Sequence, residues 1–426
     1  MTLSRRRLLG YGVGSVGTGV FSAVPGLLLL YYLTDVLGVA AGLAGAVLVA
    51  PKVWDVLLNP VVGAASDREA VRTGSRFRLL LLGSVTLPVA FAATFAAPGA
   101  PLVAVAFILA ASAFACFQVP YVALPAEMSA SPAERTRIMS WRVVCLTVGI
   151  LVAGGLAPAL AQAAGYAVMG VAIGAVMAAA LLAATFATRW VRSSPGPAPL
   201  GLVAAFRVAR GNRAFFALLS AFVVQALGVA VMLAGAPYVA AHRLGDYGLT
   251  SAMFVGMVGP SMLAVPVWAW LGRTRGMVRA YLAAAAGFGL VALALVAALS
   301  ARSVAAVLAL TALAGVCYAG LQLLPLSLLP DTVHADTART GHAQAGAFTG
   351  LWTAGETAGM AVGPGLFALV LAVSGFVSLE GSAAQPAAAL TGLTLGFTAL
   401  PAALMFASLP LIIWYAKESR ERVGAA

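Results

Sequence analysis

The feature that most constrains this chain is the recurrence of apolar segments long enough to cross a lipid bilayer. About 20 apolar residues span the hydrocarbon core as a helix. Lipid offers no partner to an unpaired backbone group, so open strands cannot span it. The pattern therefore predicts an all-α membrane protein with twelve transmembrane helices. They are expected at about 9–33, 38–62, 79–97, 101–125, 139–165, 166–188, 214–241, 249–272, 280–300, 303–328, 344–374 and 390–416.

The charge content agrees with this class. Only 9% of the 426 residues are charged and 62% are hydrophobic, with a mean hydropathy of +1.00. Soluble domains carry about 25% charged residues. The net charge of +12 would suit a nucleic-acid partner, but the basic residues lie in short clusters between apolar segments. We therefore expect no nucleic-acid partner, and membrane lipid around the chain.

The placement of the basic residues predicts the topology. If the N-terminus lies in the cytoplasm and the loops alternate, all but four of the 25 lysines and arginines fall on the cytoplasmic side. The four exceptions are Arg243, Arg302, Lys52 and Arg142. Cytoplasmic loops of membrane proteins carry an excess of Lys and Arg. This predicts a multi-pass protein of the cytoplasmic membrane with both termini in the cytoplasm.

The helices group into two sets of six. The predicted divisions are an N-terminal bundle at 1–188, a cytoplasmic linker at 189–213, a C-terminal bundle at 214–416 and a cytoplasmic tail at 417–426. The second helix of each set is followed by a related basic loop, at 63–78 and 272–279. An internal repeat of this kind is typical of transporters whose binding site lies near the membrane midplane.

Four charged residues fall within predicted spans: Lys52, Asp55, Arg142 and Glu356. A charge at the centre of a membrane helix costs at least about 2.5–3.5 kcal/mol, so such residues should face the protein interior. Lys52 and Asp55 are three residues apart and share a helix face. The four formal charges sum to zero. The group is either a proton- or cation-coupling site or a structural network of ion pairs.

Neutral polar residues within the spans are candidates for substrate contact. We predict this role for four residues, although each could instead bond a neighbouring helix: Gln118, Tyr121, Gln322 and Trp352. The three cysteines, at 116, 145 and 317, show no C-x-x-C spacing, and no catalytic triad is evident. We expect no metal site, no cofactor beyond a coupling ion and no enzymatic activity. His334, Asp336 and His342 are expected in a solvated loop.

A second group of charged residues should form a cytoplasmic gate. Asp67 and Arg68 are expected in the loop after the second helix, and Glu127 and Arg135 after the fourth. Their contacts would hold the outward-facing state. The alternative is that these charges only solvate the loops and set the topology. The five glycines at 10, 12, 14, 17 and 19 are expected to allow close helix packing.

Several motifs resemble one branch of the major facilitator superfamily, the glycoside–pentoside–hexuronide:cation symporters, which include melibiose permease. They are Tyr31–Gly38 (YYLTDVLG), Trp54-Asp55, Asn59-Pro60, Val119-Pro120-Tyr121 and Glu134-Arg135. The resemblance implies two pseudo-symmetric six-helix bundles around a central cavity. It also implies a monomer that transports solute by alternating access.

Departures from that family bear on the coupling ion. Sodium-coupled members have two acidic residues four apart on helix 2, whereas here Asp55 is followed by Asn59. Two further ligand positions align with Leu58 and Ala115. We therefore expect proton coupling or passive facilitation in preference to sodium coupling.

Other departures bear on the substrate. The family's sugar-binding acidic residues align with Gly19 and Gln118, its helix 4 tryptophan with Val122, and its helix 11 lysine with Glu356. We expect a small organic solute that is less polar than a disaccharide. The alternatives are a sodium-coupled sugar or glycoside symporter and a lipid or lysolipid translocase.

Overall fold

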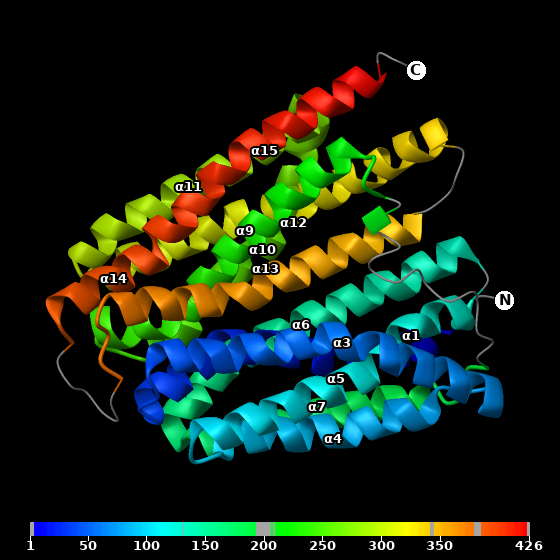
Figure 1. Ribbon diagram of the computed structural model, residues 1–426, viewed down its shortest axis with the longest axis horizontal. Helices are drawn as coiled ribbons and strands as arrows, with labels where there is room; N and C mark the ends of the chain where they lie inside the picture. Colours follow the sequence, from blue (N-terminus) through cyan, green and yellow to red (C-terminus); the bar gives the residue numbers. More distant parts are fainter. Residues whose placement is uncertain are drawn as a thin grey trace. The chain divides into compact units, whose positions relative to one another are not determined.

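The structure is a computed structural model that describes residues 4–129, 131–192, 206–207, 209–340, 345–378 and 385–423 (Figure 1). The described residues contain helices and connecting segments and no β-strand. Eleven helical segments among them are long and apolar enough to cross a membrane. Together with α3, they correspond to the twelve predicted spans. The all-α fold expected from the sequence is confirmed.

The described contacts divide the chain into two compact units. The first contains α1 (Arg5–Gly12), α2 (Gly14–Val24), π-helical segments η1 (Pro25–Leu29) and η2 (Tyr32–Val36), α3 (Ala41–Thr73), α4 (Phe77–Ala96), α5 (Ala100–Met128), α6 (Pro132–Ala164) and α7 (Tyr166–Ala187). The second contains α9 (Arg213–Tyr238), π-helical segment η3 (Val239–Arg243), α10 (Leu249–Arg275), α11 (Met277–Ser300), α12 (Val304–Thr340), α13 (Ala345–Val373), α14 (Ala387–Phe397) and α15 (Ala399–Val423).

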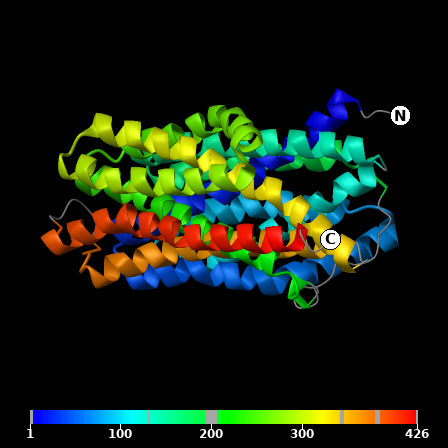
Figure 2. The ribbon, with the colours of Figure 1, turned by 90° about the horizontal axis from the view of Figure 1, so that it is seen from above.

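The helix pairings inside the two units correspond to one another. In the first unit, α2 packs on α6 and α7, α4 on α5 and α7, and α3 on α5. In the second unit, α9 packs on α13 and α15, α11 on α12 and α15, and α10 on α12. Both ribbon views show α11 and α15 side by side (Figures 1 and 2). Each of these pairs therefore has a counterpart six spans away, as an internal repeat requires.

Several helices extend beyond the apolar segments that predicted them. Asp67 and Arg68 lie in the last turns of α3, Glu127 in the last turn of α5, and Arg135 in the first turn of α6. Our placement of these residues in loops was wrong. The apolar pattern ends at the membrane boundary, but backbone hydrogen bonding continues the helix into water.

The same correction applies in the second unit. His334 and Asp336 belong to α12 rather than to a loop, and residues 417–423 continue α15 rather than forming a separate tail. His342 and most of the predicted linker lie outside the described residues.

Glycines allow α2 and α6 to approach closely. A side chain at Gly19 would meet the carbonyl oxygen of Leu146, and one at Gly149 would meet that of Val16. Gly10, Gly14 and Gly17 likewise face side chains of α7. Interfaces between membrane helices are rich in such small residues because backbones can then pack directly. The prediction that the glycine series serves helix packing is confirmed.

Candidate functional site

Lys52 and Asp55 lie on one face of α3. Both are partly buried, and the Lys52 ammonium interacts electrostatically with the Asp55 carboxylate. The Oδ1 atom of Asp55 is shielded from solvent and accepts no hydrogen bond from the described residues. The adjacent Trp54 donates its indole N–H to Ser112 Oγ at 2.9 Å, which fixes this part of α3 against α5. The helix therefore presents a carboxylate oxygen that its own unit leaves unsatisfied.

Arg142 on α6 is the third of the four charged residues that we predicted to lie within spans. Its guanidinium carbon lies 6.0 Å from the ring centroid of Tyr121, and its Nε atom is shielded without an acceptor among the described residues. Gln118, one turn before Tyr121 on α5, has a shielded Oε1 atom without a donor there. Both residues are only partly buried. They remain candidates for substrate contact.

Tyr121 is placed differently from its prediction. The side chain is 1% exposed. Its hydroxyl donates to the Tyr11 carbonyl at 2.5 Å and lies 2.9 Å from Ser15 Oγ. Its ring stacks on Tyr11 and Phe117 at centroid distances of 4.5 and 4.9 Å. In this structure Tyr121 joins the first and fourth spans, and its hydroxyl is already engaged.

The second unit brings Glu356, Gln322 and Tyr318 to one small cavity, with a volume of about 20 Å³. Gln322 Nε2 donates to the Tyr318 hydroxyl at 2.6 Å. A cavity of this size holds about one water-sized group. Glu356 lies on α13, whereas the other two residues lie on α12. The cavity suits a proton or a water molecule and is too small for an organic substrate.

Gln225 lines the same cavity, although it was not among the four residues that we predicted to contact substrate. It accepts a hydrogen bond from Tyr281 at 2.8 Å and donates to Ser408 Oγ at 2.9 Å. These bonds tie α9 to α11 and α15. Trp352, predicted to contact substrate, is 3% exposed and stacks on Phe222 at 4.5 Å. Its indole N–H has no acceptor among the described residues.

The predicted coupling residues thus form three local groups. The Lys52 ammonium attracts the Asp55 carboxylate electrostatically, and the Arg142 guanidinium lies over the Tyr121 ring. Glu356, Tyr318 and Gln322 line one cavity. The first two groups belong to one unit and the third to the other.

Two of the four predicted gate residues, Asp67 and Glu127, contact an arginine that the sequence did not single out. Arg76, 6% exposed, contacts Asp67 at 2.8 Å and Glu127 at 2.9 Å and donates to Ser66 Oγ at 2.6 Å. Arg135 Nε instead donates to the carbonyl of Ser129 at 2.7 Å. Arg68 is exposed. Asp67 and Glu127 are therefore linked through Arg76 within the first unit.

Comparison with known protein families decides the family. The family model described as MFS/sugar transport protein matches residues 10–417. The chain belongs to this family. Two curated relatives from Escherichia coli (strain K12) are the "Putative glycoside/cation symporter YagG" and the "Glucuronide carrier protein homolog". They confirm the resemblance to glycoside–pentoside–hexuronide symporters.

The alignments with these two relatives are partial. The first is 32% identical over 161 residues, covering 36% of this chain and 35% of the relative. The second is 29% identical over 154 residues and covers 34% of each. The chain therefore matches about a third of each relative's length.

Solved structures show the same fold over the whole chain. A bacterial homologue of the human lysosomal transporter Spinster has a TM-score of 0.69 at 12% identity, covering 99% of this chain and 98% of that one. The nucleoside transporter NupG has a TM-score of 0.64 at 13% identity, covering 96% and 99%. The major facilitator fold is therefore confirmed.

One departure from the MFS/sugar transport family now has a structural cause. At Gly19, where the resemblance implies an acidic residue in sugar-transporting members, the Leu146 carbonyl occupies the space that a side chain would need. The close approach of α2 and α6 thus excludes a carboxylate at this position.

Proposed function

We propose that this protein is a secondary transporter that moves a small organic solute across the cytoplasmic membrane by alternating access, with both termini in the cytoplasm. One observation carries the proposal. Polar atoms in the spans of both units are buried and have no partner among the described residues. At the predicted site residues, they include Asp55 Oδ1, Gln118 Oε1, Arg142 Nε and Trp352 Nε1.

Buried polar groups of structural importance are almost always hydrogen-bonded. Leaving one unpaired in an apolar medium costs several kcal/mol. A purely structural network would therefore satisfy these atoms within its own unit, as Gln225 is satisfied by Tyr281 and Ser408. Unsatisfied groups are expected where a substrate or coupling ion supplies the missing partner. This favours the functional interpretation of Asp55 and Arg142 over the structural one.

Proton coupling fits the acidic residues best. Asp55 is the one carboxylate on α3 between Ala41 and Ser66, and Asn59, one turn later, is neutral and exposed. A single carboxylate can bind a proton unaided, whereas sodium needs several oxygen ligands. When Asp55 is protonated, its attraction to Lys52 is lost. Glu356 would act in the same way beside Gln322 and Tyr318, in a cavity that admits about one water.

The same site gives the expected class of substrate. Gln118 and Arg142 offer hydrogen bonds, but Gly19 cannot carry the acid that binds sugar hydroxyls in relatives. We propose a solute with fewer hydroxyl groups than a disaccharide.

The test is uptake into proteoliposomes under imposed proton or sodium gradients, with a panel of solutes. The variants are Asp55→Asn, Glu356→Gln and the matched control Asp331→Asn, an exposed carboxylate near the end of the α12 span. We expect a proton gradient to drive uptake. Asp55→Asn should lower the driven component at least about tenfold while solute exchange without a gradient persists. The control should behave like the wild type.

Other outcomes would overturn parts of this proposal. Uptake driven only by sodium would show that further oxygens complete a cation site around Asp55. Equilibration unaffected by either gradient would make the protein a facilitator and the charged residues structural. Movement of labelled lipid without solute uptake would identify a lipid translocase instead.

A further inference from the structure

A groove of about 550 Å³ lies at one end of the first unit, lined by Phe77, Phe186, Arg189 and Trp190. Phe77 begins α4, Phe186 lies in the last turn of α7, and Arg189 and Trp190 lie just beyond the end of that helix. The rings of Phe77 and Phe186 meet edge to face at 5.7 Å, and Phe186 remains 49% exposed. One wall of the groove is therefore aromatic and accessible.

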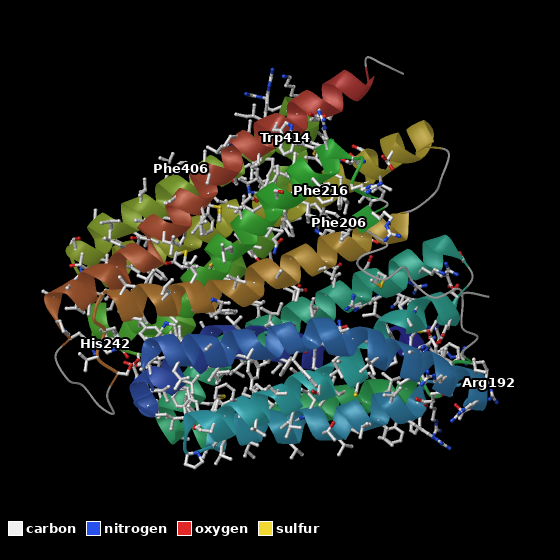
Figure 3. The ribbon with its side chains drawn as sticks, in the orientation of Figure 1. Arg192, Phe206, Phe216, His242, Phe406 and Trp414 are labelled. Atoms are coloured by element: carbon white, nitrogen blue, oxygen red, sulfur yellow. The ribbon has the colours of Figure 1, made fainter. Side chains whose placement is uncertain are left out.

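Basic side chains lie in the groove and next to it. The Arg7 guanidinium lies over the Trp190 ring at 4.1 Å, and Arg189 lines the groove directly. Arg192, labelled in Figure 3, follows two residues after Trp190. Its guanidinium lies near Gly74, the residue just after the end of α3. All three arginines are exposed. A cation stacked on an aromatic ring is held in place without losing its charge.

These arginines lack carboxylate partners. Among the described residues, none forms an ion pair with Arg7, Arg189 or Arg192, and the nearby acids are already occupied. Asp67 and Glu127 contact Arg76. Glu69 accepts the backbone N–H groups of Arg78 and Leu79 at 2.7 and 3.1 Å. Glu69 thus fills the N-terminus of α4, so an incoming anion would meet arginine side chains rather than that helix end.

The groove also lies at the depth of a membrane boundary. The spans Arg5–Leu29 and Phe77–Ala96 begin here, and the span Tyr166–Ala187 ends here. Aromatic and basic residues at this level lie among lipid headgroups. The distribution of Lys and Arg predicts that this end faces the cytoplasm, where the leaflet carries anionic lipid.

We propose that this groove binds the phosphate of an anionic phospholipid. Arg7 and Arg189 would hold the phosphate, and the first part of an acyl chain would lie against Phe77 and Phe186. Charge complementarity identifies the occupant, since an unpaired basic wall and an apolar aromatic wall meet at headgroup depth. The inference does not rest on the proposed transport activity, and its test needs no transport substrate.

The experiment measures lipid retained by the full-length protein in native mass spectrometry, together with its unfolding temperature in detergent. Phosphatidylglycerol is compared with phosphatidylcholine, glycerol 3-phosphate and inorganic phosphate. The variant is Arg7→Gln/Arg189→Gln, and the matched control is Arg273→Gln/Arg275→Gln, which removes the same charge from exposed positions at the end of α10. We expect the wild type and the control to retain phosphatidylglycerol in preference to phosphatidylcholine. The Arg7→Gln/Arg189→Gln variant should need an at least about tenfold higher concentration of phosphatidylglycerol to reach the same retention.

Further arms keep the proposal falsifiable. Arg189→Lys, which keeps the charge, should retain most of the binding, and each variant is first checked for unchanged stability without lipid. Equal losses in both double variants would show a diffuse charge effect and overturn the site. Equal stabilisation by inorganic phosphate, without a retained lipid, would assign the groove to a free anion and overturn the lipid assignment. Equal retention of the two lipids would also overturn it.

Discussion

Tyr11 and Tyr121 exchange hydrogen bonds between their hydroxyls and main chains: the Tyr121 hydroxyl donates to the Tyr11 carbonyl at 2.5 Å, and the Tyr11 hydroxyl donates to the Tyr121 carbonyl at 3.3 Å. The rings stack between these bonds at 4.5 Å. The pair fastens α1 to α5 inside the first unit, with Ser15 of α2 as a third member. The fourth span, α5, therefore contains Tyr121, which bonds to α1, and, one turn earlier, Gln118, whose Oε1 atom has no donor among the described residues.

Tyr121→Phe should therefore destabilise the protein without altering substrate affinity. The substitution keeps both ring stacks and removes a bonded hydroxyl, which in a membrane protein costs about 0.6–1.7 kcal/mol. We expect a lower unfolding temperature and a KM for uptake within about twofold of wild type. Tyr11→Phe, which removes the longer bond, should have the smaller effect. A large rise in KM with unchanged stability would show that the Tyr121 hydroxyl contacts substrate after all.

Gln225 should behave as a structural residue despite lining the cavity of Glu356. Gln225→Leu removes the partners of Tyr281 and Ser408. A double-mutant cycle with Tyr281→Phe, read from unfolding free energies, should give a coupling of about 0.6–1.7 kcal/mol. If the two effects simply add, the hydrogen bond contributes nothing to stability, and Gln225 becomes a candidate for the transport pathway.

The loss of stability caused by substitutions around Arg76 should increase with the burial of the ion pair that each substitution breaks. Arg76→Gln withdraws the guanidinium from Glu127, whose side chain is 8% exposed, and loss of a buried pair costs about 3–5 kcal/mol. Asp67 is 36% exposed, so Asp67→Ala should cost about 0–1 kcal/mol. Arg78→Gln is the matched control, since that exposed residue is bonded through its backbone N–H.

The same variants test the gate. Asp67→Ala should slow solute exchange while leaving substrate binding, measured by ligand-induced stabilisation, within about twofold of wild type. Unchanged turnover in Asp67→Ala would mean that the network only anchors the helix ends and sets topology.

Two glycine-to-alanine substitutions should affect the free energy of unfolding differently: one should lower it and the other should leave it unchanged or raise it. Gly149→Ala places a methyl group against the Val16 carbonyl, where the backbone of α2 would have to move. We expect it to cost at least about 1–3 kcal/mol, as overpacking does. Gly256→Ala on α10 meets nothing within 4 Å. It should be neutral or stabilising by up to about 1 kcal/mol. Thermal unfolding measures both, and equal effects would contradict the assigned packing of α2 on α6.

Much of the fold could be predicted because the bilayer imposes one rule on every span. A run of apolar residues identifies a membrane helix whatever lies beside it, and the glycines of the first span indicate close packing without naming the neighbour. Helix ends were not predictable in this way. Asp67 and Glu127 are polar, yet their backbones remain in α3 and α5, because hydropathy reports the surrounding medium rather than the hydrogen bonding.

The candidate site was less predictable, because side-chain roles depend on how each helix is rotated. Gln118 and Gln225 both stand alone in apolar sequence, but one is left unsatisfied and the other joins three helices. Arg76 resembles its neighbours Arg72 and Arg78 in a basic run, and only the folded chain selects it as the partner of two carboxylates. Charge periodicity alone contains no signal for that choice.

Because α12 is longer than the bilayer is thick, the position of the membrane surface can be measured along it. Its 37 residues extend about 55 Å, whereas the hydrocarbon core is about 30 Å thick. One continuous helix therefore passes from lipid into water, although Pro325 and Pro330 each remove one N–H donor from its hydrogen-bond ladder. Its amides should exchange with heavy water slowly within the bilayer and quickly in the projecting turns. The residue at which the exchange rate changes would mark the membrane surface on α12. The number of turns from that residue to Gln322 would then give the depth of Gln322 in the bilayer, and of Glu356, which lines the same cavity.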